Sequence, residues 1–262
     1  VTGAGTLQQL TAYTLTINNA LSLPSTITLN LSGGNVTGAG SLNIPGPVNW
    51  NSGKVSIPVT FTGTAVVNLS GSEEILASTL TNNGTINWSG VYFSFDGGTL
   101  NNNGTINNTG NGYLYKYTTG LINNNSGGTF KKLAGVGTTY SQVDLKNSGT
   151  IDVQSGIFQI YSDTFTNSSV INIAAGATFQ NAYVSFFNSG TSVTGAGTLL
   201  QATSYALTCN TPISLPSTIT LSVSGGNING TGSLSIAGTL TWSAGTISIP
   251  TTLASTGTAN AN

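Results

Sequence analysis

The sequence predicts an all-β protein, a parallel β-solenoid (β-helix) of roughly 12 rungs, with about 20–23 residues per rung and no significant helix. Three observations predict this fold: a short phrase that recurs at that spacing, a composition that favours strands, and an alternation of apolar and polar residues. Few architectures have such a period, because a propeller blade needs about 40 residues or more and a leucine-rich repeat has its own leucine frame.

The short repeat has the form hydrophobe-x-Asn-Asn/Ser-Gly-Thr-Ile. It reads LTNNGTIN from Leu80 and LNNNGTIN from Leu100, and looser copies begin at Ile122, Leu145, Phe165 and Phe186. The corresponding Gly or Ser residues recur at nearly even spacing, once per expected rung, and are Gly84, Gly104, Gly127, Gly149, Ser169 and Gly190. Since Gly and Asn adopt left-handed conformations at low cost, we expect the corner of each rung here. Parallel stacking then places Asn above Asn, so that their amides hydrogen-bond along the rod.

A longer repeat encloses the short one. Val1–Thr60 and Val193–Thr252 share 37 identities in 60 positions without a gap, at an offset of 192 residues. We therefore expect residues 1–262 to form a single continuous solenoid, with 1–192 as one long unit of about nine rungs and 193–262 as the start of a second copy. The chain has no Met, and we expect it to be a processed protein or a piece of a longer tandem array.

The composition favours sheet and excludes several kinds of partner. Charged residues make up 4% of the chain, which lacks His and has a net charge of −1, against about 25% charged residues in ordinary soluble domains. We expect no nucleic-acid partner, because no basic patch exists to contact phosphates. We expect no membrane insertion, because no apolar run approaches the ~18 residues of a spanning helix. Like charges would stack on one another in successive rungs, which explains their scarcity.

Within each expected rung, strand segments alternate in the way that gives one inward face and one outward face. In Thr26–Leu31, residues Ile27, Leu29 and Leu31 share one face. A second alternating segment, Gly238–Ile249, has its apolar residues at Leu240, Trp242, Ile247 and Ile249. Stacking of these side chains on their counterparts, at about 25 cal/mol per Å² buried, is the expected main stabilising term.

Three segments have a repeat pattern similar to that of a known group of proteins. They are LTNNGTINWSG (80–90), LKNSGTIDVQSG (145–156) and GSLSIAGTLTWSAGTISIP (232–250). They resemble the β-helical repeats of large secreted bacterial surface proteins of the haemagglutinin and autotransporter-passenger type. The resemblance implies an extracellular or cell-surface location and a non-enzymatic role as a stalk, adhesin or fibre. The expected partners are neighbouring copies stacked end to end, with surface glycans as a further partner. No catalytic, cofactor or metal residue carries over from the resemblance.

Two other function classes remain open. A polysaccharide-degrading β-helix would need paired carboxylates, and the acids are Glu73, Glu74, Asp96, Asp144, Asp152 and Asp163. Asp144 and Asp152 are eight residues apart and can share a rung or adjacent rungs, although a solvated position at turns is the simpler interpretation. An ice-binding face would use Thr-x-Thr triplets, which occur at Thr14–Thr16, Thr26–Thr28, Thr218–Thr220 and Thr239–Thr241 but not in every rung.

Three residue types have both a structural and a functional interpretation. The aromatic residues Tyr92, Phe93, Phe95, Tyr113, Tyr115 and Tyr117 form either a bulkier core or an exposed strip that binds sugar rings or another chain. Cys209 aligns with Ile17 across the long repeat, so we expect a small apolar core residue. Asn-x-Ser/Thr triplets begin at Asn30, Asn35, Asn68, Asn83, Asn87, Asn103, Asn167 and Asn229, which are glycan acceptors only in a suitable host.

Overall fold

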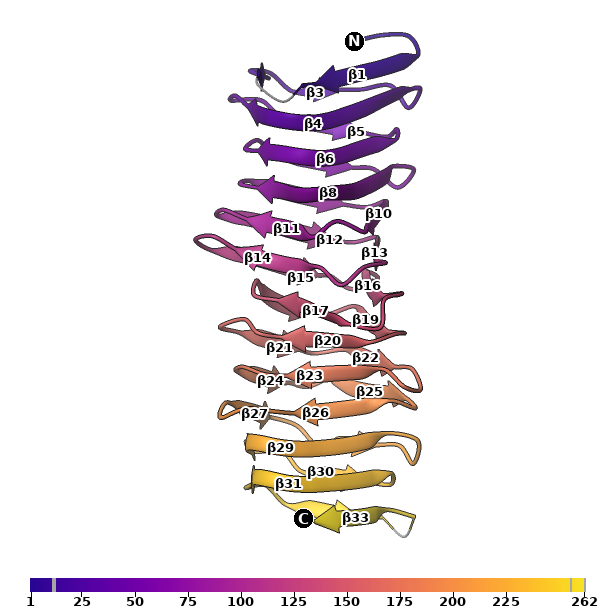
Figure 1. Cartoon of the computed structure of the whole chain (residues 1–262), viewed down its shortest axis with the longest axis vertical. Coiled ribbons are helices and arrows are strands. Elements are labelled where there is room, and N and C mark those ends of the chain that lie inside the picture. Colours follow the sequence, from indigo (N-terminus) through magenta and orange to yellow (C-terminus); the bar gives the residue numbers. More distant parts are fainter. Residues whose placement is uncertain (11–12, 255, 262) are drawn as a thin grey trace.

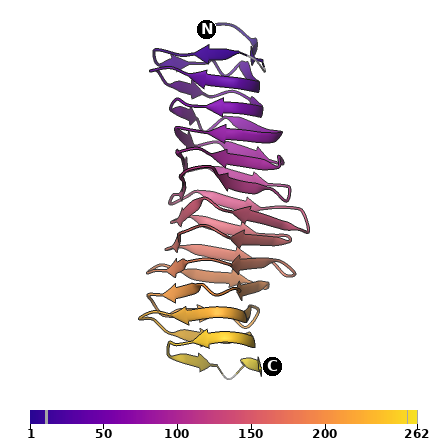
Figure 2. The ribbon, with the colours of Figure 1, turned by 60° about the vertical axis from the view of Figure 1, so that its left-hand side comes forward.

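The computed structural model describes residues 1–10, 13–254 and 256–261. In this part the chain winds through about 12 turns, every strand pairs in parallel with its neighbours, and no helix is present. Figure 1 shows the turns stacked in sequence order from the N-terminal to the C-terminal end, and Figure 2 shows the same stack from another side. The predicted all-β parallel β-solenoid is therefore confirmed.

Each turn contributes a strand to three sheets, which we call the first, second and third faces. The first face contains β1(Gly5–Gln9), the opening residues of β4(Ile27–Thr37), β6(Val48–Val55) and β8(Val66–Leu76), then β10(Thr85–Trp88), β13(Thr105–Asn108), β16(Thr129–Lys132), β19(Thr150–Val153), β22(Val170–Ile173), β25(Ser192–Gly195), β28(Ile213–Leu215), β30(Leu234–Ile236) and β32(Thr251–Leu253). The second face contains β2(Thr14–Thr16), the closing residues of β4, β6 and β8, then β11(Tyr92–Phe95), β14(Tyr113–Lys116), β17(Thr138–Ser141), β20(Ile157–Ile160), β23(Thr178–Asn181), β26(Thr198–Gln201), the opening residues of β29(Thr220–Asn229) and β31(Thr239–Ile247), and β33(Thr258–Ala261). The third face contains β3(Leu21–Ser22), β5(Leu42–Ile44), β7(Val59–Phe61), β9(Thr79–Asn82), β12(Gly98–Asn102), β15(Gly120–Asn124), β18(Asp144–Asn147), β21(Phe165–Asn167), β24(Ser185–Phe187), β27(Ala206–Cys209) and the closing residues of β29 and β31.

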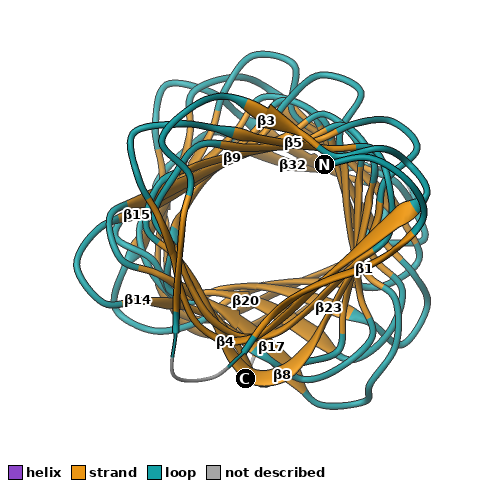
Figure 3. Cartoon of the chain, turned by 90° about the horizontal axis from the view of Figure 1, so that it is seen from above, coloured by secondary structure: helices purple, strands orange, loops and turns teal. Residues whose placement is uncertain are grey.

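The core lies along the axis, inside the ring of strands seen in Figure 3. Inward residues stack in columns, as in Leu80, Leu100, Ile122, Leu145 and Phe165 on the third face, all at most 1% exposed. Because parallel pairing places equivalent residues one above another, each apolar side chain is covered above and below by its neighbours. The predicted inward positions in Thr26–Leu31 are all buried.

The length of a turn varies more than the sequence predicts. The steps from Leu42 to Val59 and from Leu234 to Thr251 are short, whereas the step from Tyr113 to Tyr140 is long. The paired segments change little in length, so the corners take up the difference as shorter or longer loops. The even spacing of the short repeat describes the corner between the third and first faces, where that repeat lies, and does not extend to every turn.

A ladder of five asparagines runs through the interior. The side chains of Asn82, Asn102, Asn124, Asn147 and Asn167 are at most 1% exposed. Each Nδ2 donates to the Oδ1 of the next, over 2.8, 2.7, 2.7 and 2.6 Å in order. The second proton of each of the first four amides points to a backbone carbonyl of the next turn, such as Thr150 O for Asn124 at 3.0 Å. The buried amides are thus satisfied, as their burial requires.

Outer asparagine ladders donate in the opposite direction along the rod. On the first face, each Nδ2 donates to the Oδ1 of the preceding turn through Asn107, Asn87, Asn68, Asn49 and Asn30, over 2.9–3.3 Å. A shorter exposed ladder joins Asn125, Asn103 and Asn83 in the same sense. The predicted stacking of asparagines is therefore confirmed, but the run Asn101–Asn103 divides between outer face, interior and corner.

Some corner glycines of the short repeat are needed for space and others for a left-handed backbone. The left-handed expectation is wrong for Gly84, Gly104 and Gly149, which have no positive φ, although it holds for Gly127 and Gly190. A Cβ on Gly104 would lie 2.1 Å from the carbonyl oxygen of Gly84 in the turn above. Successive turns approach too closely here for any side chain.

The long repeat does not return to the same face. Between β1 and β25 the first face makes nine steps, and β26 follows on the second face. Thr6–Gln9 in β1 and its counterpart Thr198–Gln201 in β26 therefore lie on different faces, and the unit of 192 residues spans nine turns and one further face. Equivalent contacts survive the displacement: Trp50 Nε1 donates to Gly53 O at 3.3 Å, and Trp242 Nε1 to Gly245 O at 3.2 Å.

Candidate functional site

Tyrosines are concentrated on one side of the rod. Eight of the nine lie on the second face or at its corner with the third, and we call them the tyrosine edge: Tyr92, Tyr113, Tyr115, Tyr117, Tyr140, Tyr161, Tyr183 and Tyr205. Four of them, from Tyr140 to Tyr205, recur at nearly even spacing, about once per turn. This spacing is visible in the sequence, but the sequence analysis did not identify it. The YLYKY segment, with three tyrosines close together, is the more obvious feature.

Within the tyrosine edge, outward tyrosines stack while the neighbouring phenylalanines fill the core. The ring centroids of Tyr113 and Tyr140 are 4.7 Å apart with planes at 8°, and those of Tyr92 and Tyr113 are 5.3 Å apart at 26°. Phe93 and Phe95 are at most 1% exposed. The phenylalanines thus form the bulkier core and the tyrosines an outward strip, because strand alternation separates them. Binding of sugar rings or another chain by this strip stays a prediction.

The strands β8, β11 and β14 lie one above another on the second face (Figure 1). A hollow opens there, lined by Glu73, Tyr92, Tyr115 and Tyr117. Glu73 Oε1 accepts hydrogen bonds from Ser94 Oγ at 2.6 Å and from Tyr117 OH at 2.7 Å, the latter reaching across two turns. The bond to the carboxylate raises the pKa of Tyr117 to about 12, because it favours the protonated phenol. We call this site the Glu73 hollow.

A second hollow lies further along the tyrosine edge. It is lined by Lys116, Gln142, Tyr161, Asp163, Tyr183 and Tyr205. Lys116 Nζ lies 2.6 Å from Asp163 Oδ2, so this carboxylate already has a cation. The rings of Tyr183 and Tyr205 have centroids 3.8 Å apart, and the hydrogen bond with Tyr205 raises the pKa of Tyr183. We call this site the Asp163 hollow.

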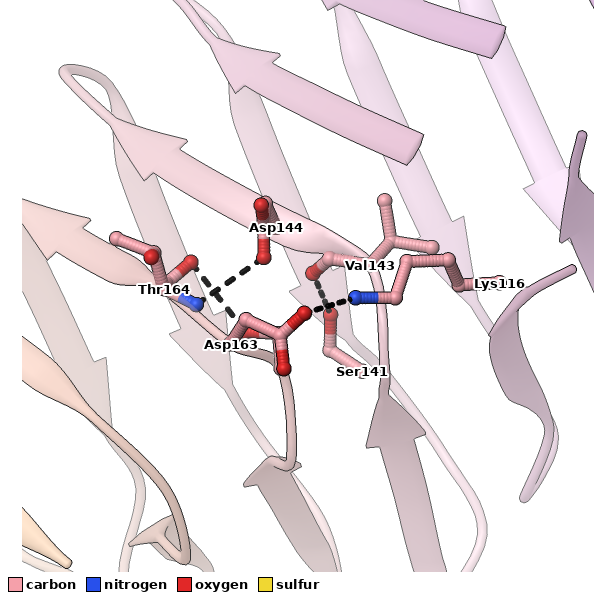
Figure 4. A network of polar contacts seen from close by, with 7 residues as sticks. Lys116, Ser141, Val143, Asp144, Asp163 and Thr164 are labelled. Atoms are coloured by element: carbon pink, nitrogen blue, oxygen red, sulfur yellow. Dashed lines mark hydrogen bonds and ion pairs between the residues drawn. The ribbon is translucent and has the colours of Figure 1, made fainter. Parts of the chain in front are cut away.

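The polar contacts around Lys116 continue onto the third face, as Figure 4 shows. Thr164 N donates to Asp144 Oδ1 at 3.1 Å, and Ser141 Oγ donates to the carbonyl oxygen of Val143 at 3.0 Å. Asp144, Lys146 and Thr164 line a third hollow, whose floor includes Gly98 and Gly120. Hydrogen bonding between corner and strand holds the turns together here.

The acids considered for catalysis are dispersed. Asp144 lies on the third face in β18, while Asp152 lies on the first face in β19, where Asn172 and Gln154 donate to it at 2.8 and 2.7 Å. Asp96 pairs with Lys54 at 2.7 Å, and this bond lowers the pKa of the Asp96 carboxyl. The structure therefore does not bring Asp144 and Asp152 to one face.

Glu74 points into the core, although its neighbour Glu73 points outward. Its side chain is fully buried, with Oε1 accepting from Gly71 N at 2.8 Å and Oε2 without a partner among the described residues. Desolvation raises the pKa of Glu74 to about 7. The apolar alternation of β8 predicts this inward direction, but a charged residue at that position could not be anticipated as buried.

Lys132 is a second buried charge. Its ammonium donates to Gly110 O at 2.6 Å, Ala134 O at 2.5 Å, Asn111 Oδ1 at 3.1 Å and Gly135 O at 3.2 Å. Desolvation lowers the pKa of Lys132. The four oxygens belong to corner loops of two successive turns, so the ammonium ties these loops together.

Cys209 and the glycan sequons also have defined places. Cys209 is fully buried, as predicted from its alignment with Ile17, and burial raises its pKa to about 12. Among the sequon asparagines, Asn35, Asn83 and Asn103 are exposed, whereas Asn167 is fully buried in the inner ladder. A glycan on Asn167 is incompatible with this fold.

Threonines form columns more often than triplets. One column on the second face runs through Thr178, Thr198, Thr220, Thr239 and Thr258 in direct register. The neighbouring outward column contains Gln180, Leu200, Ser222, Thr241 and Asn260 instead. On this face, two threonine columns therefore do not run side by side, and a Thr-x-Thr triplet is not repeated from turn to turn.

Comparison with known proteins found no matching family model, no matching curated protein and no matching solved structure. Residues 1–10, 13–254 and 256–261 contain no group of three or more His, Cys, Asp or Glu side chains placed to hold a metal ion. The part of the chain that the structure describes has no helix long and apolar enough to cross a membrane.

Proposed function

We propose that this chain is a segment of a non-enzymatic extracellular structural protein, a stalk or fibre-forming part of a repetitive surface adhesin or filament. The observation that carries the proposal is the long repeat itself. Two copies of one sequence occupy different faces of the same rod and keep the same contacts, such as the indole-to-carbonyl bonds of Trp50 and Trp242. A sequence that repeats in this way suits a rod that extends by adding units.

The proposed partners are neighbouring copies, stacked end to end. The strands β1, β2 and β3 at one end, and β32 and β33 at the other, each pair on one side only within the described residues. Open strand edges are templates for further pairing, and a following unit would cover them. Surface glycans are a further proposed partner, through the tyrosine edge.

Electron microscopy of the native material tests this proposal. We expect rods with an axial rise of about 45 Å per unit, from nine turns and one face at ~4.8 Å per turn. Compact globular particles in place of rods would contradict it. Incubation with a panel of polysaccharides tests the enzyme alternative, and release of reducing ends would favour that alternative over a structural role.

Ice binding is a second candidate, supported by the in-register threonine column of Thr178 to Thr258. Its hydroxyls recur with the turn spacing of ~4.8 Å. The mixed composition of the column beside it favours the structural proposal. Thermal hysteresis of the purified chain decides between them, since a rod without an ice-binding face gives none.

A further inference from the structure

We propose that the Glu73 hollow binds an organic cation, a quaternary or alkylated ammonium group, between the rings of Tyr92, Tyr115 and Tyr117 and the carboxylate of Glu73. This inference is independent of the structural role proposed above. It rests on the arrangement of the rings, the state of the carboxylate and the charges around the hollow.

The ring of Tyr115 stands nearly at right angles to the rings of Tyr92 and Tyr117. The planes of Tyr115 and Tyr117 meet at 87° with centroids 5.0 Å apart, and those of Tyr92 and Tyr115 at 78° with centroids 5.9 Å apart. Electron-rich ring surfaces therefore border the hollow from different directions. Rings in such an arrangement attract a cation through their quadrupoles, and the attraction strengthens as the cation is desolvated.

The carboxylate of Glu73 is positioned but not neutralised. Its Oε1 is held by Ser94 Oγ and Tyr117 OH, while Oε2 has no hydrogen-bond partner among the described residues. Ser94 is fully buried beneath the tyrosines although it points outward in β11. Because a small residue stands here, Tyr117 can reach over the intervening turn of β11 to Glu73 and enclose the hollow.

The lysines of the neighbouring strands already have partners within the described part of the chain. Lys54, in the turn before, is paired with Asp96 at 2.7 Å, and Lys116, on β14, is paired with Asp163 at 2.6 Å. Tyr117 carries no charge, since its hydrogen bond to Glu73 keeps the phenol protonated. The hollow therefore holds one uncompensated negative charge beside three aromatic rings, which favours a cationic group over a neutral sugar.

The Asp163 hollow is a matched control within the same molecule. It also combines tyrosines with a carboxylate, but its carboxylate is paired with Lys116. If aromatic rings alone attracted the ligand, both hollows would bind it. If the unpaired charge is required, only the Glu73 hollow binds.

The experiment is a titration of the full chain with tetramethylammonium and with choline, at constant ionic strength, followed by the ring-proton NMR signals of the tyrosines. The neutral carbon isostere of choline and a methyl glycoside serve as comparison ligands. We expect saturable shifts of Tyr92, Tyr115 and Tyr117 with the cations, and affinity at least about tenfold weaker for the neutral isostere.

The variants Glu73→Gln and Tyr183→Leu separate the two hollows. Glu73→Gln keeps an acceptor for Ser94 and Tyr117, so we expect a folded chain with affinity reduced at least about tenfold. Tyr183→Leu removes a ring of the Asp163 hollow and keeps the pair of Lys116 and Asp163, so it leaves the affinity unchanged. Tyr115→Leu removes one ring of the Glu73 hollow and is expected to weaken binding as well. Equal binding of the isostere, binding of the glycoside alone, or loss of binding only in Tyr183→Leu would each overturn the proposal. The rods seen by microscopy would be unaffected by any of these outcomes.

Discussion

Asn102 Nδ2 donates a 2.7 Å hydrogen bond to Asn124 Oδ1, one turn further along the rod and inside the hydrophobic core. The same bond joins each successive pair of the inner ladder. A slip of one residue in any turn would turn its asparagine outward and place an outer residue in the core. The ladder therefore fixes the register of five turns as well as satisfying its own amides.

Replacement of Asn124 by alanine is expected to destabilise the central turns by about 2–4 kcal/mol, since it leaves the amide of Asn102 and the carbonyl of Asn147 without their partners in the core. Urea unfolding followed by circular dichroism measures the loss. The matched control is Asn123→Ala, which removes an outer amide bonded to Asn101 and should cost less than about 1 kcal/mol. Equal losses in both variants would contradict a special role for the inner ladder.

Replacement of Gly104 by alanine is expected to destabilise the fold by more than about 2 kcal/mol, because the new methyl group would meet the carbonyl oxygen of Gly84 at 2.1 Å. Thermal unfolding measures the effect. Gly127 provides the comparison, since its φ is 86° and nothing lies within 4 Å of a Cβ placed there. Gly127→Asn should be tolerated, because Asn adopts this conformation readily. A similar loss of stability in both variants would show that close approach of the turns is not the cause.

The free energy of unfolding should fall as pH rises from acid to neutral values because of Glu74. Its pKa is raised from 4.5 to about 7, so the folded chain binds more protons than the unfolded chain between these values. The contribution of Glu74 is complete below about pH 4.5 and is lost above about pH 7, an effect of up to about 3 kcal/mol. Chemical unfolding at a series of pH values measures it.

Glu74→Gln should remove most of that dependence and stabilise the chain at pH 8, since the amide keeps the acceptor for Gly71 without a buried charge. Glu73→Gln is the comparison on the same strand and should move the profile only slightly, to lower pH, because desolvation is the main cause of the raised pKa of Glu74 and the charge of Glu73 adds least to it. A profile in Glu74→Gln as steep as that of the unmodified chain would assign the dependence to another group.

Cys209 should resist thiol reagents in the folded chain. Its thiol is fully buried and its pKa is raised to about 12, so almost no thiolate is exposed at pH 8. Labelling with an aromatic disulfide reagent is expected only as the turns around β27 open, at a rate that follows denaturant concentration. Complete labelling within the mixing time in buffer would contradict the buried position.

The architecture can be predicted from the sequence because the repeats have the length of one turn. Leu80, Leu100 and Ile106 are apolar at positions that recur from turn to turn, and stacking explains such a period. The inner ladder is harder to predict from the sequence, since Asn102 is polar and its neighbours Asn101 and Asn103 are also asparagines. Nothing in a run of three asparagines tells which one faces the core until the strand phase is known.

The surface sites depend on relationships between turns that the linear sequence does not reveal. Glu73 and Tyr117 are far apart in the sequence and meet only because the stacking of β8, β11 and β14 lets the tyrosine side chain reach back across two turns. Similarly, Asp144 and Asp152 are close in sequence but lie on different faces. Residues a few positions apart within one turn can therefore lie on different faces of the rod. Residues separated by the length of a whole turn lie next to each other on the same face.

In a rod that continues by adding units, the displacement of the long repeat by one face would produce a threefold screw. A feature on the second face of one unit would have its counterpart on the third face of the next and on the first face of the unit after that. Three units would bring the pattern back to its starting direction. A surface such as the tyrosine edge, repeated with the unit, would then point outward in three directions in turn, and such a rod would meet a partner from any side without having to rotate.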